Sequence, residues 1–220
     1  MKAPIDPWER TSETTIALSG SSVRIVHPMN ADDLISEADY VKDERLPYWA
    51  DIWPSSRILA EELLLEVDAN GKSLLELGCG VGLVSLAAVQ AGFSVLASDY
   101  YEPALEFTAR NVANNTSGSV RTLHWSWRDP FPLPESFDVV AASDILYESE
   151  YVTLIADILI QLLRPGGSAI FADPGRVLAR DFLTRCTGLG LRLFSHKRIR
   201  ITDAGRKQTI DIYRFRRDAA

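Results

Sequence analysis

The chain has 220 residues and a formal net charge of −7 at pH 7, and 46% of its residues are hydrophobic. This length and composition predict one domain with a sizeable buried core, and the acidic balance argues against a protein that wraps nucleic acid. The two cysteines, Cys79 and Cys186, are too few for a disulfide framework and do not indicate a metal site.

The apolar runs bear on where the chain resides. Residues 1–10 lack the apolar stretch of a signal peptide, and no apolar run reaches the ~20 residues that a membrane span requires. We therefore expect a soluble, cytoplasmic and monomeric protein that binds neither a membrane nor a metal.

The N-terminal part, residues 1–57, is predicted to form an extension or lid ahead of a core at 58–215. Two apolar runs at 15–18 and 23–26 flank Ser-Gly-Ser-Ser, which predicts a β-hairpin outside the main sheet. Residues 32–40 predict a short helix.

An unusual aromatic segment precedes the first helix of the predicted core. Tyr48, Trp49 and Trp53 lie within six residues, and Pro54 begins an amphipathic helix. Buried tryptophans could anchor this helix on the sheet, because aromatic side chains carry a large apolar area. The alternative is that they cover a bound ligand, and the sequence leaves both interpretations open.

Residues 73–99 predict a strand, a glycine turn, a helix and a second strand. Gly78, Gly80 and Gly82 allow the backbone to turn sharply and a ligand to approach it closely. The predicted helix, 83–91, points its free N–H groups at the same place. The unit is therefore a candidate ligand-binding turn.

The end of the second strand indicates which ligand. Asp99 follows Gly80 by nineteen residues and is placed to accept hydrogen bonds from both hydroxyls of a ribose, which predicts an adenosine-containing cofactor. The spacing G-x-G-x-G, with Glu76 two residues before it, differs from the G-x-G-x-x-G of dinucleotide sites and argues against an NAD-dependent oxidoreductase. A tight turn that binds no nucleotide is the structural alternative.

The rest of the chain alternates helices and strands. Helices are predicted after Pro103, over 152–162 (ended by Arg164-Pro-Gly-Gly167) and around Phe182, and strands at 120–123, 137–143, 168–172, 191–194 and 209–215. The predicted fold class is α/β: a Rossmann-like, mostly parallel, doubly wound sheet with a C-terminal antiparallel strand pair.

Candidate ligand-binding residues follow two of these strands. Trp125 comes after the strand at 120–123, and Ser143, Asp144 and Tyr147 come at the end of 137–143 or just beyond it. Open α/β sheets bind ligands at the carboxyl ends of their strands, so these side chains should gather at one edge. A core position for Trp125 and a helix-capping role for Asp144 are the structural alternatives.

The segment Glu76-Leu-Gly-Cys-Gly-Val-Gly82 resembles motif I of the seven-strand methyltransferases that use S-adenosylmethionine. The resemblance implies that Glu76, Gly78, Gly80 and Gly82 surround the methionine part of the cofactor. It implies also that Asp99 holds the ribose.

Two further segments, Pro47-Tyr-Trp-Ala-x-x-Trp-Pro54 and Asp144-Ile-Leu-Tyr147, narrow the resemblance to the family-16 methyltransferases. Within that family both look like the lysine methyltransferase of the electron-transfer-flavoprotein β-subunit. The family resemblance implies cofactor contacts for Trp53, Trp125 and Ser143.

The same resemblance makes Asp144 and Tyr147 the candidate catalytic residues. A carboxylate beside a lysine favours the charged ammonium and raises the pKa of the amine, so Asp144 is expected to bind and orient the acceptor rather than deprotonate it. Tyr147 is expected to help shape the acceptor channel.

The resemblance predicts methylation of a lysine side chain in a protein, with the electron-transfer-flavoprotein β-subunit as a candidate partner. Asp173-Pro-Gly-Arg176 resembles the same enzyme, and residues 192–217 hold nine bases against two acids. Lys197 to Lys207 are predicted to form a loop between the last two strands, which either faces an acidic partner or is a solvated surface. The alternatives are a small-molecule N-methyltransferase for a nicotinamide-like amine, a protein arginine methyltransferase, and a cofactor-binding protein without catalysis.

Overall fold

The computed structural model describes residues 6–35, 46–66, 68–203 and 205–219. Strands β1 (Thr11–Leu18) and β2 (Ser21–Pro28) form a separate two-stranded antiparallel sheet, which confirms the predicted hairpin. The helix predicted at 32–40 corresponds only to the short 3-10 helix η1 (Ala31–Leu34), and residues 36–45 lie outside the described part.

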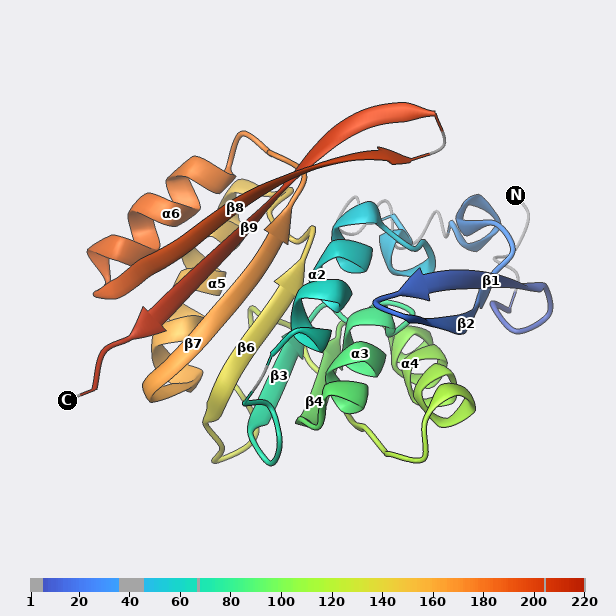
Figure 1. Cartoon of the computed structure of the whole chain (residues 1–220), viewed down its shortest axis with the longest axis horizontal. Helices are drawn as coiled ribbons and strands as arrows, with labels where there is room; N and C mark the ends of the chain where they lie inside the picture. The colour runs from blue at the N-terminus through green and yellow to red at the C-terminus, as the bar shows by residue number, and fades with distance from the viewer. Residues whose placement is uncertain (1–5, 36–45, 67, 204, 220) are drawn as a thin grey trace.

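The main sheet has seven strands in the order β5-β4-β3-β6-β7-β9-β8 (Figure 1). All neighbouring pairs from β5 to β7 are parallel, and β9 is antiparallel to both β7 and β8. This topology confirms the predicted fold class. The strands are β3 (Ser73–Leu77), β4 (Ser94–Asp99), β5 (Arg121–His124), β6 (Phe137–Ser143), β7 (Leu163–Asp173), β8 (Leu191–Asp203) and β9 (Arg206–Arg217).

Helices cover both faces of the sheet. On one face lie α2 (Pro54–Leu64), α3 (Leu83–Ala91) and α4 (Glu102–Asn115), and on the other lie α5 (Ser149–Leu162) and α6 (Ala179–Gly188) (Figure 1). Because the central strands are covered on both sides, their residues are buried on both faces, as the continuous buried run 74–77 of β3 illustrates, in which Glu76 is the one polar residue. No helix in the described part of the chain is long and apolar enough to cross a bilayer.

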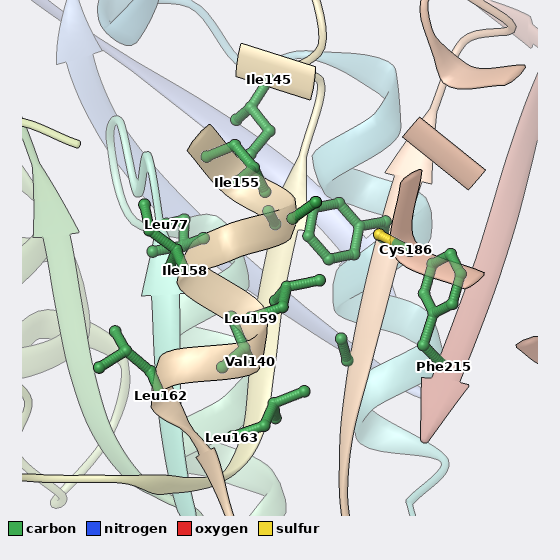
Figure 2. Packing of buried hydrophobic residues seen from close by; sticks show 14 of the residues in the cluster. Leu77, Val140, Ile145, Ile155, Ile158, Leu159, Leu162, Leu163, Cys186 and Phe215 are labelled. Atoms are coloured by element: carbon green, nitrogen blue, oxygen red, sulfur yellow. The ribbon is translucent and has the colours of Figure 1, made fainter. Parts of the chain in front are cut away.

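The core between the sheet and α5 is the largest apolar cluster. Ile155, Leu159 and Leu162 are spaced at helical intervals on α5 and pack toward Leu77 and Val140 of the sheet (Figure 2). Each of these five side chains is at least 95% buried. This packing fixes the position of the segment between β6 and α5, which holds the candidate catalytic residues.

The predicted end of the helix at residue 162 is confirmed, because α5 ends at Leu162, ahead of Arg164-Pro-Gly-Gly167. The predicted start of the next strand was wrong: β7 begins at Leu163 rather than at 168, and its pairing with β6 skips residues 164–167. The last two strands are also far longer than predicted. Lys197 and Lys207 lie on β8 and β9 of one long hairpin rather than in a loop.

One side chain joins the N-terminal hairpin to the glycine turn. The fully buried Asn111 of α4 accepts a hydrogen bond from the Val26 amide (2.8 Å) and donates to the carbonyl oxygens of Val26 and Val81 (2.8 Å each). The small sheet is thereby attached to the segment that begins α3.

Candidate cofactor and acceptor site

A cleft opens at the carboxyl ends of β3, β4 and β6, with a volume of about 980 Å³ including its open mouth. This is the edge at which doubly wound sheets bind ligands. Most of the predicted site residues line it, namely Trp53, Gly78, Gly80, Asp99, Trp125, Ser143, Asp144 and Tyr147. Glu76 and Gly82 are not among the lining residues.

The glycine turn forms the floor of the cleft. Gly78, Gly80 and Gly82 all have positive φ angles, which L side chains adopt with strain. A Cβ at Gly80 would lie 2.9 Å from the carbonyl oxygen of Trp49, and a Cβ at Gly82 would lie 2.7 Å from the Cα of Thr108. Gly80 therefore lets the aromatic segment pass over the turn, whereas Gly82 lets α4 pack against it.

Asp99 is the buried acid at the floor of the cleft. It is 6% exposed; its Oδ2 accepts a hydrogen bond from the Gly80 amide (2.9 Å) and its Oδ1 accepts one from the Tyr101 amide (3.0 Å). Burial raises the pKa of this carboxyl, and the backbone hydrogen bonds oppose that rise. Since a carboxylate oxygen can accept a second hydrogen bond, Asp99 can hold the turn and still bind hydroxyl groups.

Glu76 lies beneath the turn instead of in the cleft. It is 1% exposed and accepts hydrogen bonds from the Ser85 hydroxyl and amide in the first turn of α3. Burial raises its pKa to about 8, and the nearby Asp99 adds to the rise. In this structure Glu76 therefore connects β3 to α3, and its predicted contact with a cofactor stays a prediction.

Aromatic side chains form the walls of the cleft. Trp53 precedes α2, and its indole N–H donates to the Tyr48 carbonyl oxygen (2.8 Å). Trp125 is 5% exposed and donates to the Asp129 carbonyl oxygen (3.1 Å), so it serves the core and the cleft together. Trp49 likewise lines the cleft while packing on Tyr101 in the core. Trp49 and Trp125 thus belong to the core and also line the cleft, whereas Trp53 lines the cleft outside these core clusters.

Asp144 occupies a strained position at the end of β6. Its φ of +59° makes it the one non-glycine residue with positive φ in the described chain, a conformation concentrated at functional sites. Its amide donates to the Ala172 carbonyl oxygen (2.9 Å), which fixes the turn. Glu148, not Asp144, precedes α5 at its cap position, so the capping alternative was wrong.

The Asp144 carboxylate has unequal partners. The Arg176 Nε donates to Oδ1 at 2.7 Å, and the Ser55 hydroxyl reaches Oδ2 only at 3.4 Å. The carboxylate side chain is 7% exposed and the Arg176 side chain 33%. One oxygen is therefore tightly held, and the other is the one that a cationic ligand could share.

Arg176 is the partner of Asp144 in the structure, a pairing that the sequence did not predict. The Asp173 Oδ1 accepts hydrogen bonds from the amides of Gly175 (2.8 Å) and Arg176 (2.7 Å), and this turn directs the guanidinium back to β6. The resemblance indicates the segment Asp173–Arg176, but nothing in its local sequence pattern specifies a partner 32 residues away.

Tyr147 lies at the mouth of the cleft. Its ring makes edge contacts with Tyr48 and Tyr151, and the Arg176 guanidinium lies 5.9 Å from its centroid. The residue is 39% exposed, and Tyr48 is 43% exposed. The rim is thus aromatic and accessible from solvent.

The residues present fit S-adenosylmethionine. The cleft offers a backbone floor without side chains at Gly78 and Gly80, a buried acid with free acceptor capacity at Asp99, and indole faces at Trp53 and Trp125. The ring walls would cover apolar and aromatic parts of such a ligand, and the acid would bind its ribose.

Comparison with known proteins agrees with this description. A family model described as lysine methyltransferase matches residues 42–184. The chain is 30% identical over 56% of its length to calmodulin-lysine N-methyltransferase of Arabidopsis thaliana. It is 27% identical over 59% of its length to the electron transfer flavoprotein beta subunit lysine methyltransferase of Xenopus laevis, and 29% identical over 78% of its length to the mouse EEF1A lysine methyltransferase 3.

These matches span 44%, 53% and 74% of the respective relatives, so the chain covers only about half the length of the first two. Among solved structures, the N-methyltransferase NodS from Bradyrhizobium japonicum, in complex with S-adenosyl-L-homocysteine, superimposes with a TM-score of 0.62 at 18% identity. That alignment covers 78% of this chain and 91% of NodS, and at this identity it supports the fold alone.

Proposed function

The chain belongs to the lysine methyltransferase family, whose cofactor is S-adenosylmethionine, and we propose that it methylates the side-chain amine of a lysine in a protein substrate. One observation carries the proposal: Asp144 and Tyr147 lie at the open mouth of the same cleft whose floor is the glycine turn and Asp99.

The cofactor would lie on the floor of this cleft. Asp99 would bind the ribose hydroxyls, and Trp53, Trp125 and Ser143 would line its other sides. When bound, S-adenosylmethionine supplies an electrophilic methyl group on a positively charged sulfur. The protein has to supply position and environment, and good alignment of reactants lowers a barrier by ~7–11 kcal/mol.

Asp144 would hold the acceptor. Arg176 keeps Oδ1 in place, which leaves Oδ2 as the oxygen that can accept a hydrogen bond from a lysine ammonium. A carboxylate favours the charged form of the amine, so Asp144 attracts and orients the acceptor but does not make it nucleophilic. The positive cofactor and burial in the cleft act in the opposite direction and favour loss of the proton to water.

The aromatic rim would contact the lysine side chain. Tyr48 and Tyr147 present exposed ring surface at the mouth, against which the methylene groups of a lysine can pack while its charge reaches Asp144. An exposed rim of this kind favours a side chain that projects from a protein surface over a small amine that must be enclosed.

Within this function, we place the electron-transfer-flavoprotein β-subunit first among candidate substrates. The support is the resemblance at residues 47–54, 144–147 and 173–176, together with the 27% identical relative that acts on that subunit by its name. The relatives named for calmodulin and EEF1A make those proteins the next candidates.

The experiment adds radiolabelled S-adenosylmethionine and the purified protein to a lysate of its own source, with the Asp144→Asn variant as a matched control. We expect label in a protein band that wild type but not the variant produces, mapped by mass spectrometry to lysine. Label only in the small-molecule fraction would overturn the protein substrate in favour of a small amine. Label on arginine would overturn lysine as the acceptor.

A further inference from the structure

The β8–β9 hairpin extends past the carboxyl edge of the sheet, beyond the arrowheads of β6 and β7 (Figure 1). One of its two faces is attached to α2. There Lys197 donates to Glu62 (2.8 Å), and Asp203 accepts from Arg57 (3.3 Å), next to Ser56 of the cleft wall. These contacts fix the end of the hairpin beside the cleft.

The opposite face of the hairpin is cationic. Side chains alternate along a strand, and the register pairs Arg198 with Asp211, Arg200 with Thr209, and Thr202 with Lys207. Arg198, Arg200 and Lys207 are all exposed, whereas Asp211 is 2% exposed. Arg198 donates to Asp211 Oδ1 (2.8 Å) and is therefore ion-paired. Within the described residues Arg200 and Lys207 form no ion pair, so their charge is available to a partner.

This cationic face continues to the acceptor site. Asp211 is the ladder partner of Asp173, and a Cβ at Gly175 would lie 4.0 Å from the Asp211 Oδ2, so the turn that presents Arg176 lies against the hairpin. Beside Arg176, Val177 is 90% exposed. The surface from the mouth of the cleft to the end of the hairpin thus combines exposed cations with one exposed apolar side chain.

We propose that this surface, formed by Arg198, Arg200 and Lys207 with Val177 beside them, docks an acidic face of the protein substrate next to its target lysine. The inference rests on the proposed function and adds the chemistry of the partner's surface. Opposite charges speed the encounter of two proteins, and exposed charges of one sign near a site also discriminate among partners. Carboxylates on the substrate would meet the cations while the lysine enters beside Tyr147.

The test compares two charge-reversal variants of the same hairpin. The double variant Arg200→Glu with Lys207→Glu reverses the charge at the end of the hairpin near the cleft. The control, Arg192→Glu with Arg216→Glu, reverses the charge of two exposed arginines that are cross-strand neighbours at the other end of the same strands. Both change the net charge equally. The readout is the initial rate of methyl transfer from radiolabelled S-adenosylmethionine into protein in a lysate of the source, at low salt and at high salt.

We expect the rate for Arg200→Glu with Lys207→Glu to fall about tenfold at low salt, because association steered by charge is strongly rate-enhancing, and to approach wild type at high salt. The Arg192→Glu with Arg216→Glu variant should match wild type at both. Equal rates for the first variant and wild type, or equal losses in both variants, would overturn the docking surface while leaving the proposed function standing. Absence of protein label with wild type itself would overturn the proposed function, and the docking surface with it.

Discussion

The floor and the mouth of the cleft are built in different ways. The floor is made of backbone: the Gly80 amide is held by Asp99, and Gly82 is fixed by the packing of α4. The mouth is made of side chains: Asp144 is held in a left-handed conformation and paired with Arg176 across 32 residues. Changes at the floor should therefore affect folding and cofactor binding, whereas changes at the mouth should affect turnover.

The sharpest way to separate the two regions is Asp144→Asn, which removes the charge but tolerates the positive φ. We expect turnover to fall about 1,000-fold, in the range for truncating one partner of a buried charge pair, with S-adenosylmethionine affinity nearly unchanged. Tyr147→Phe keeps the ring and should cost less than about tenfold. If isothermal titration calorimetry shows that the Asn variant has lost cofactor binding, then Asp144 contributes to cofactor binding, as the residues of the floor do, and the distinction between the two regions fails.

The packing that supports the floor can be tested at Gly82. Gly82→Ala should lower the free energy of unfolding by about 2–4 kcal/mol, since the new methyl adds overpacking against Thr108 to the cost of a positive φ. Gly20→Ala is the matched control, because Gly20 has φ +85 and open space around its Cβ position, and it should lose only about 1–2 kcal/mol. Urea unfolding measures both. Similar losses in the two variants would mean that close packing at Gly82 is unimportant.

Asp99 is the residue of the floor that we propose to bind the cofactor. Asp99→Ala should weaken S-adenosylmethionine binding by ~1.5–3 kcal/mol, the range for hydrogen bonds to a charged group. The loss should appear in calorimetry of variant protein that retains its circular dichroism spectrum. Unchanged affinity would remove the ribose role assigned to this acid, and tighter binding of NAD than of S-adenosylmethionine by wild type would contradict the cofactor itself.

The smallest expected effect is a pH dependence at Glu76. Its pKa rises from 4.5 to about 8 on folding because of burial, so the folded state binds the proton more tightly and the free energy of unfolding falls as pH rises through this window. From pH 6 to 7 the decrease should be about 1 kcal/mol larger in wild type than in Glu76→Gln. Parallel stability curves for the two proteins would mean that Glu76 is ionised in the folded state at pH 6.

The sequence predicts the floor better than the mouth because the floor is local. Strand, glycine turn, helix and Asp99 lie within residues 73–99, and their periodicity and turn chemistry are visible in the chain. Arg176 pairs with Asp144 only because β6 and β7 are neighbours, a fact of topology. Glu76 and Gly82 belong to the predicted ligand-binding motif, yet neither lines the cleft. Their spacing in the sequence does not distinguish a residue that lines a cleft from one that supports it.

The C-terminal hairpin shows a second limit. The prediction located β8 and β9 but ended β8 at residue 194, although Ile199 and Ile201 alternate with polar residues beyond it and pack against the core. The density of basic residues between 197 and 207 favoured a loop, and only the pairing with β9 shows that the ladder continues to Asp203.

Asn111 couples the stability of the N-terminal hairpin to ligand binding in the cleft. The Asn111 side-chain amide is hydrogen-bonded to Val26 of β2 and to Val81 of the cleft at the same time, so we expect a ligand that orders the glycine turn to order the hairpin as well. Coupling of this kind is reciprocal: the free energy by which a bound ligand stabilises the hairpin equals the free energy by which the folded hairpin strengthens ligand binding. The exchange rate of the Val26 amide hydrogen is thus a remote reporter of an occupied cleft, read from the far side of α4.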